Sequence, residues 1–175
     1  MPGAWGRVLA AGLLLSAAAG CVGADAAEGQ RRPADASCPV TMPMDVARLP
    51  PVLARSGDDV WYGEGGLWVG LSWVGAPGAA APVRPDGGGL KYPSVTLRDG
   101  RHTEALGPPT VRARRLDAPG TARVSFGGYA DGGIDSIPRY WWPTGIDFPD
   151  SGCWLVTEAL GDDVVRFVVR VEETT

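Results

Sequence analysis

The stretch CWLVTEAL-GDD-VVRFVVRV, residues 153–171, decides the fold of this chain. It holds two runs rich in β-branched residues, 153–160 and 164–171, and between them stands Gly161-Asp162-Asp163. That composition and spacing predict a β-hairpin. Alternation along the second run predicts that every other side chain faces the core, while the rest face outward or toward a neighbouring strand. The expected core set is Val165, Phe167, Val169 and Val171, and the expected outer set is Val164, Arg166, Val168 and Arg170.

The rest of the chain divides into short strands of the same kind, because 26 glycines and 16 prolines are spread along its 175 residues. Residues 67–73 alternate and predict a half-buried strand, with Leu67, Val69, Leu71 and Trp73 on one face. Weaker strands are expected at residues 38–42, 94–97, 111–116 and 121–126, and Pro93 indicates an edge strand or a bulge. About seven or eight strands at this spacing favour an all-β, antiparallel sandwich over a barrel or a parallel sheet.

The first residues have the pattern of an export signal. Arg7 supplies a positive charge, and residues 8–19 form an apolar run broken only by Ser16. Because this run is shorter than the roughly 20 residues that a spanning helix needs, we expect it to be removed after targeting. The end of the run, Ala18-Ala19-Gly20-Cys21, is similar to the lipobox of bacterial lipoproteins.

The lipobox resemblance implies that Cys21 is diacylated and anchors the chain to the extracytoplasmic face of the cell membrane. Ala18 stands where that family most often has Leu. The alternative is ordinary cleavage at a small-x-small site such as Ala24-Asp25-Ala26, which would release a soluble protein without Cys21. The lipoprotein interpretation divides the chain into a signal peptide (1–20), a flexible tether (21–36) and one domain (37–175).

Two cysteines, Cys38 and Cys153, remain in the expected domain. An even pair in an exported protein is more often a disulfide than a metal site, so we expect these two to be bonded to each other. Two buried free thiols are the alternative. Their distance in sequence does not fit the C-x-x-C spacing of catalytic redox cysteines.

The run FPDSGCWLVT, residues 148–157, carries a resemblance to a known family. Together with the hairpin that follows, it is similar to the C-terminal signature of uncharacterised actinobacterial lipoproteins with an immunoglobulin-like sandwich. Residues 61–63, 67–69 and 115–117 resemble earlier parts of the same pattern. The resemblance implies an immunoglobulin-like fold outside the cytoplasm, and it leaves the activity open because its motifs are structural.

Few residues are suited to catalysis or to cofactor binding. His102 is the only histidine and follows Asp99-Gly100-Arg101, so we expect it on the surface. No nucleophile elbow, Walker loop or zinc-protease motif occurs, and one histidine without a free thiol is an atypical zinc site. We therefore expect no cofactor and no metal. The net charge of −4 and the single lysine, Lys91, argue against a nucleic-acid partner.

Four aspartates lie close together in sequence among glycines and aromatic residues. They are expected to be solvated loop residues that form Asx turns. One alternative is a calcium site, although residues 131–135 lack the ligand spacing of an EF-hand loop. Another is a glycoside hydrolase, which needs only two carboxylates at the correct separation. The four residues are Asp131, Asp135, Asp147 and Asp150.

The tryptophans and tyrosines carry the remaining functional signal. Trp73 and Trp154 are expected to pack against the disulfide and the opposite sheet. Tyr140-Trp141-Trp142-Pro143 lies in a stretch rich in Gly and Pro, where a loop is expected and adjacent side chains cannot all point inward. Exposed aromatic side chains form ligand and partner surfaces, so Tyr140, Trp141 and Trp142 are candidate ligand-binding residues. The alternative is that they fold back and cap the core.

These patterns together predict a lipid-anchored, extracytoplasmic binding or interaction module of the cell envelope, without enzymatic activity. The expected partners are the membrane, through the lipid anchor, and a cell-wall glycan or an envelope protein. A glycan hydrolase that uses Asp131, Asp135 or Asp147 is one alternative, and a structural or stress-related accessory lipoprotein is another.

Overall fold

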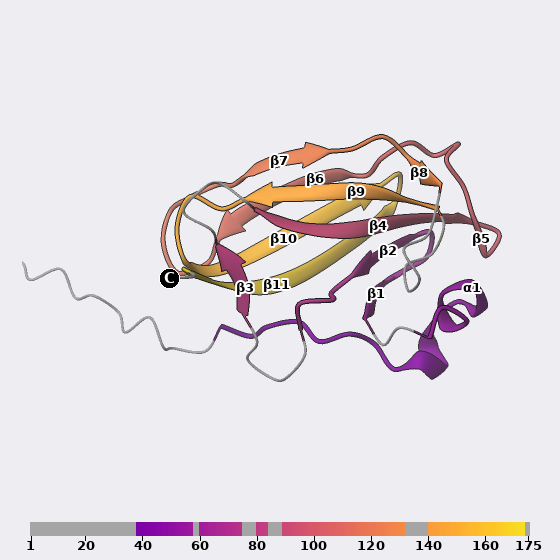
Figure 1. Ribbon diagram of the computed structural model, residues 1–175, viewed down its shortest axis with the longest axis horizontal. Helices are drawn as coiled ribbons and strands as arrows, with labels where there is room; N and C mark the ends of the chain where they lie inside the picture. The colour runs from indigo at the N-terminus through magenta and orange to yellow at the C-terminus, as the bar shows by residue number, and fades with distance from the viewer. Residues whose placement is uncertain (1–37, 58–59, 75–79, 84–88, 132–139, 174–175) are drawn as a thin grey trace, which may run out of the picture. The chain divides into compact units, whose positions relative to one another are not determined.

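The computed structural model describes residues 38–57, 60–74, 80–83, 89–131 and 140–173, all of which belong to the unit Arg32–Thr175. They form eleven strands and two short helices, and the strands make two sheets (Figure 1). The prediction of an all-β, mainly antiparallel architecture is confirmed. The strands are more numerous than the seven or eight expected. Cys21, the tether and Asp135 lie outside the described residues.

The larger sheet, sheet A, has the strand order β1-β2-β4-β9-β7, with β5 paired to β4 and β8 paired to β9. All of its pairs are antiparallel. Its strands are β1 (Trp61–Glu64), β2 (Leu67–Gly70), β4 (Leu90–Arg98), β5 (Arg101–His102), β7 (Arg123–Phe126), β8 (Ala130–Asp131) and β9 (Tyr140–Asp147).

The smaller sheet, sheet B, has the order β3-β11-β10-β6 and contains the predicted hairpin. Strands β10 and β11 are antiparallel in a register that pairs Val156 with Phe167, while β3 runs parallel to β11. The predicted core set of β11 is confirmed, since each of its four side chains is at most 2% exposed. The strands of sheet B are β3 (Ala80–Val83), β6 (Thr110–Arg115), β10 (Gly152–Leu160) and β11 (Asp163–Glu173).

The main core contains buried side chains from both sheets. Burial of this apolar surface is the main favourable term in folding. Trp73 packs at its border, with its ring centroid 5.7 Å from that of Tyr92 and 6.3 Å from that of Phe167. The expectation that Trp73 contacts the opposite sheet is therefore confirmed, because Phe167 belongs to β11.

Strand β2 is buried on both faces, so the prediction of a half-buried strand is wrong. Trp68, expected on the outer face, is only 4% exposed and belongs to a second apolar cluster. Leu49, which follows η1 (Val46–Arg48), contributes to this cluster, as does α1 (Pro51–Ala54), whose Leu53 is fully buried. The buried members of this cluster are Leu49, Leu53, Trp61, Trp68, Val95 and Leu97.

Pro93 lies in a central strand and not at the predicted edge. Strand β4 pairs with β2 on one side and with β9 on the other, and its registered pairing with β2 ends at Ser94. Pro93 stands opposite Pro143 of β9, where a mutually hydrogen-bonded pair is impossible because neither residue has an N–H. At a non-hydrogen-bonded pair no N–H is needed between the two residues, so both prolines fit there without the loss of a hydrogen bond between β4 and β9.

Residues 38–42 are not a strand, so the prediction of a first strand there is wrong. The segment is nevertheless attached to β11. The N–H of Thr41 donates to the carbonyl oxygen of Val168 at 3.0 Å, and Thr41 Oγ1 accepts from the N–H of Val168 at 2.8 Å. Pro39 and Pro43 flank this contact, and they lack the N–H groups that a longer ladder requires.

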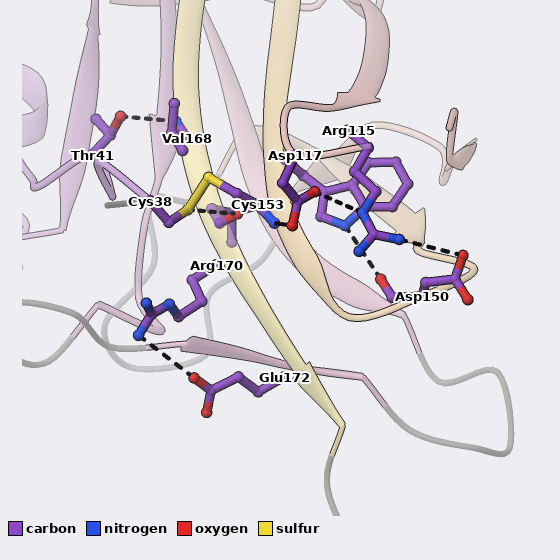
Figure 2. The surroundings of a disulfide bond; sticks show 11 residues. Cys38, Thr41, Arg115, Asp117, Asp150, Cys153, Val168, Arg170 and Glu172 are labelled. Carbon is purple, nitrogen blue, oxygen red and sulfur yellow. Dashed lines mark hydrogen bonds and ion pairs between the residues drawn. A yellow bond between two sulfur atoms is a disulfide. The ribbon is translucent and has the colours of Figure 1, made fainter. Parts of the chain in front are cut away.

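A disulfide between Cys38 and Cys153 fixes the same segment covalently, with the two Cα atoms 5.5 Å apart (Figure 2). The predicted pairing is confirmed. Successive side chains of a strand point to opposite faces, so Cys153 lies on the outer face of sheet B while Trp154 points into the main core. There Trp154 packs against Phe148, with ring centroids 5.1 Å apart. The expectation that Trp154 packs against the disulfide is wrong for this reason.

A polar cluster beside the disulfide joins two of the sequence motifs that carry the family resemblance (Figure 2). Arg115 Nε donates to Asp117 Oδ1 at 2.7 Å, and Arg115 Nη1 lies 3.7 Å from Asp150 Oδ2. Asp117 Oδ2 accepts from the N–H of Cys153 at 3.4 Å. Partial burial raises the pKa of Asp117, but the hydrogen bonds from Arg115 and from backbone N–H groups outweigh it and lower that pKa below 3.8. These residues therefore hold the end of β6 against the start of β10.

Replacing Cys38 and Cys153 together with serine is expected to lower the free energy of unfolding by about 2 to 5 kcal/mol. The bond joins residues 115 positions apart and so restricts the unfolded chain. Urea unfolding of the double variant beside the wild type measures the difference, and reduction of the wild type should shift the midpoint in the same direction. Equal midpoints for the two proteins would contradict the expectation.

Candidate functional site

Strand β9 places Tyr140 and Trp142 on one face and Trp141 on the other. The prediction of a loop at 140–143 is wrong, because pairing with β8 and β4 holds this stretch as the first half of β9. Trp142 points inward and is 8% exposed, so it offers little surface to a ligand. Tyr140 is 42% exposed, and Trp141, which points to the opposite face, is half-buried.

Tyr140 lines an open groove with a volume of about 860 Å³, which we call the Tyr140 groove. Side chains from α1, from β5 and the turn after it, from the residue before β8 and from the first residue of β9 meet there. The chain thus gathers residues from four separate segments into one concave surface. The groove residues used below are Arg55, Arg101, His102, Glu104, Tyr129 and Tyr140.

Aromatic rings form one wall of the Tyr140 groove. The rings of Tyr129 and Tyr140 are stacked, with centroids 6.2 Å apart and planes inclined by 19°. Trp142 lies 4.9 Å from Tyr129 and supports it from the inner face of the sheet. Trp142 Nε1 donates to Thr96 Oγ1 at 3.4 Å, which fixes the indole in the interior. Trp142 is therefore a supporting residue, whereas Tyr140 presents its ring to solvent.

His102 is half-buried in the Tyr140 groove, and not on the open surface where the sequence analysis placed it. Its ring centroid lies 5.9 Å from that of Tyr140. Burial lowers the pKa of His102 from its usual 6.5, so the imidazole is mainly neutral at pH 7. Nδ1 is buried and has no hydrogen-bond partner among the described residues.

Trp141 lines a second groove, of about 380 Å³, which we call the Trp141 groove. It lies over the part of sheet A where β4, β9 and β7 are neighbours. Phe126 of β7 contributes a 40% exposed ring, and Pro93 and Pro143 add apolar surface to the same groove. The alternation of β9 therefore separates Trp141 from Tyr140 and gives each a different groove.

Asp131 and Asp147 do not come together as a catalytic pair. Asp131 is paired with Tyr140 at the beginning of β9, whereas Asp147 ends the same strand. Seven steps of about 3.3 Å put their backbones roughly 23 Å apart, beyond the separation of about 5 to 9.5 Å found in glycoside hydrolases. Asp150 lies 3.7 Å from Arg115 in the polar cluster beside the disulfide.

Neither a metal site nor a membrane-spanning helix is found in the part of the chain that the structure describes. No three His, Cys, Asp or Glu side chains among these residues gather as metal ligands would. No described helix combines the length and the apolar character that crossing a bilayer requires.

A buried carboxyl group between the sheets is a feature that the sequence analysis missed. Glu158 of β10 is fully buried, and its Oε1 accepts from Tyr92 Oη at 2.6 Å and from Ser94 Oγ at 3.1 Å. Ser94 Oγ also lies 2.7 Å from Thr144 Oγ1, so one polar network joins β10 of sheet B to β4 and β9 of sheet A. Glu158 Oε2 has no partner among the described residues.

Burial controls the ionisation of this network. Desolvation raises the pKa of Glu158 to about 7, although the hydrogen bonds from Tyr92 and Ser94 act in the opposite direction. Burial also raises the pKa of Tyr92 well above 10, and the charge and hydrogen bond of Glu158 add to this effect. Tyr92 therefore stays a neutral donor, and Glu158 is the group of the network that titrates near neutral pH.

Comparisons with known proteins gave no match to this chain, whether with family models, curated proteins or solved structures. The resemblance of residues 148–157 to actinobacterial lipoproteins therefore stays a prediction.

Glu158→Gln is expected to change how stability depends on pH. Between about pH 4.5 and pH 7, folded Glu158 keeps a proton that the unfolded chain has lost, so the folded state loses stability as the pH rises through this window. The loss amounts to roughly 3 kcal/mol and is complete above the folded pKa. Glutamine does not titrate, so the free energy of unfolding of the variant should not fall by this amount between about pH 4.5 and pH 7.

Urea unfolding at several pH values from 4 to 8 measures how the free energy of unfolding depends on pH in the wild type and in Glu158→Gln. The matched control is Glu64→Gln, which changes an exposed glutamate of β1 and should follow the wild type. Parallel curves for the wild type and Glu158→Gln would contradict the expected titration.

Proposed function

We propose that this chain is a lipid-anchored binding module of the cell envelope, that it holds a glycan in the Tyr140 groove, and that it carries out no catalysis. The observation that carries the proposal is the stacked pair of Tyr129 and Tyr140, whose rings line an open groove together with polar and charged side chains. Binding sites commonly combine aromatic surface with a few polar groups that fix the orientation of the ligand.

The chemistry of a sugar ring matches this groove. One face of the ring is made of C–H groups, and stacking that face on Tyr140 removes apolar surface of both partners from water. The hydroxyl groups at the rim of the ring then need hydrogen-bond partners, which Thr103 and Glu104 can supply. The buried Trp142 holds Tyr129 in place, so little side-chain freedom is lost on binding.

The envelope location rests on the export signal and on Cys21, and the disulfide supports it. Disulfides persist in oxidising compartments outside the cytoplasm. A diacylated Cys21 would hold the domain at the membrane through a tether of about sixteen residues, the span 21–36.

We also propose that the sandwich is immunoglobulin-like. Two packed sheets of mainly antiparallel strands, with Trp154 in the core between them, support this assignment. In antibody domains the disulfide links the two sheets, whereas here it links β10 to the segment before the first strand. The proposal therefore concerns the sandwich architecture and not the antibody subgroup.

Tyr140→Ala is expected to weaken retention on purified cell-wall polysaccharide or peptidoglycan by about tenfold or more, because it removes the exposed ring of the stack. Its thermal unfolding should change little, since the side chain is 42% exposed. Phe126→Ala is the matched control, because Phe126 is 40% exposed but lies in the Trp141 groove. Equal retention of Tyr140→Ala and the wild type would overturn the choice of groove.

The lipid anchor has a separate test. Intact mass of the membrane-extracted protein should give a chain that begins at a diacylglyceryl-modified Cys21, and Cys21→Ser should move the protein out of the membrane fraction. A mature wild-type chain that begins downstream of Cys21 would refute the anchor and leave the groove unaffected.

A further inference from the structure

The charged side chains of the Tyr140 groove give it a local charge opposite to that of the whole chain. Arg55 and Arg101 line the groove, and Glu104 is the only acidic residue among the described residues that line it. With His102 mainly neutral at pH 7, the groove carries a net positive charge, although the chain as a whole carries −4.

Neither arginine is engaged elsewhere by an ion pair that the described residues show. The ion pairs found among those residues involve Arg115 and Arg170, both on sheet B and outside the groove. Arg55 follows α1, and Arg101 begins β5, so the two guanidinium groups reach the groove from separate elements. They are thus able to contact different groups of one extended ligand.

Arginine is the residue best suited to a carboxylate or a phosphate. Its planar guanidinium offers N–H groups that pair with two oxygens of such a group at once. A neutral sugar would leave the net positive charge of the groove without a counter-charge, while its ring would still stack on Tyr140. The two arginines therefore favour a ligand that carries a negative charge, whereas the aromatic wall alone does not select for charge.

We infer that the Tyr140 groove selects anionic glycans, with Tyr140 stacking on a sugar ring while Arg55 and Arg101 bind carboxylate or phosphate groups of the same chain. This inference rests on the proposed function, because it names the ligand class of the same groove. Glu104 faces the same space, where its carboxylate accepts hydrogen bonds from sugar hydroxyls and disfavours an acidic group beside it.

Calorimetric titration with matched ligands tests the inference. The first pair is an oligogalacturonide and its methyl ester, which share a backbone and differ in charge. The second pair is a phosphorylated maltooligosaccharide and the unphosphorylated oligosaccharide. We expect the charged member of at least one pair to bind about tenfold or more tightly than the neutral member, and the difference to shrink as salt is added. The pair that shows the difference identifies carboxylate or phosphate as the preferred group.

Single substitutions test whether Arg55 and Arg101 cause the difference in affinity between charged and neutral ligands. Arg55→Gln and Arg101→Gln should each weaken binding of the charged ligand by about tenfold and leave any binding of the neutral ligand nearly unchanged. The matched control is Arg112→Gln, which changes an exposed arginine of β6 outside the groove and should bind like the wild type. Thermal unfolding of all three variants checks that they are folded.

The outcomes separate the two claims. If charged and neutral members bind equally and the arginine variants match the wild type, while Tyr140→Ala loses binding, the anionic selectivity is overturned and the glycan-binding groove stands. If none of the four ligands binds while cell-wall polysaccharide is still retained through Tyr140, the inference fails and the glycan-binding groove stands. If Tyr140→Ala binds as well as the wild type, the glycan-binding function itself fails and the inference fails with it.

Discussion

The two-residue repeat of strand β10 is the constraint on which the rest of this structure depends. β10 is hydrogen-bonded to β11 on one side and to β6 on the other along almost its whole length, so it cannot rotate or slip without breaking both ladders. Its inward side chains, including Trp154 and Val156, anchor the core between the sheets. Its outward Cys153 holds the segment before β1, whose continuation supplies η1 and α1. The second apolar cluster and one wall of the Tyr140 groove therefore follow from the same strand.

The parts of the fold that could be predicted are those that depend on residues close together in the sequence or on the number of cysteines. The β10–β11 hairpin was predictable because both strands and their turn are contiguous and alternate regularly. The disulfide was predictable because the predicted export signal sets Cys21 aside, and an even pair of cysteines in an exported protein is more often a disulfide than a metal site. In contrast, the burial of Trp68 depends on Leu53, which comes from a helix too short to show a periodic pattern. No local pattern indicates which segment will cover the second face of a strand.

The site was predictable only in part, for the same physical reason. The sequence pointed to Tyr140, Trp141 and Trp142, but the composition around them suggested a loop, in which three neighbouring side chains have no fixed directions. Pairing of β9 with β8 and β4 turns Trp141 to one face and Tyr140 and Trp142 to the other. Of these last two, Trp142 is buried, so Tyr140 is the one that faces the larger groove. Arg55, Arg101 and Tyr129 join it through contacts distant in sequence, which no motif announces. Glu158 did leave a signal, since it shares the alternation of Trp154 and Val156 and so belongs to the inward face of β10.

The network around Glu158 shows that polar side chains are tolerated inside this sandwich where they form hydrogen bonds from one sheet to the other. An isolated buried carboxylate is strongly unfavourable, whereas a protonated one that accepts from Tyr92 and Ser94 loses much less on burial. Hydrogen bonds are directional in a way that apolar contacts are not. The network therefore favours one alignment of β10 against β4 over the many that an entirely apolar interface would permit.

The position of the disulfide also determines how the domain would respond to mechanical load. If the proposed lipid anchor and a bound ligand are drawn apart, the domain is pulled through the chain that precedes Cys38. Tension that travels along the chain toward Cys38 passes through the sulfur bridge into β10, which is braced by a strand on each side. While the disulfide is intact, tension on the N-terminal chain cannot unfold the residues after Cys38, which include α1 and Arg55. Under the proposed anchoring, the disulfide would carry tension from the N-terminal chain into β10 and leave the residues that line the groove in place.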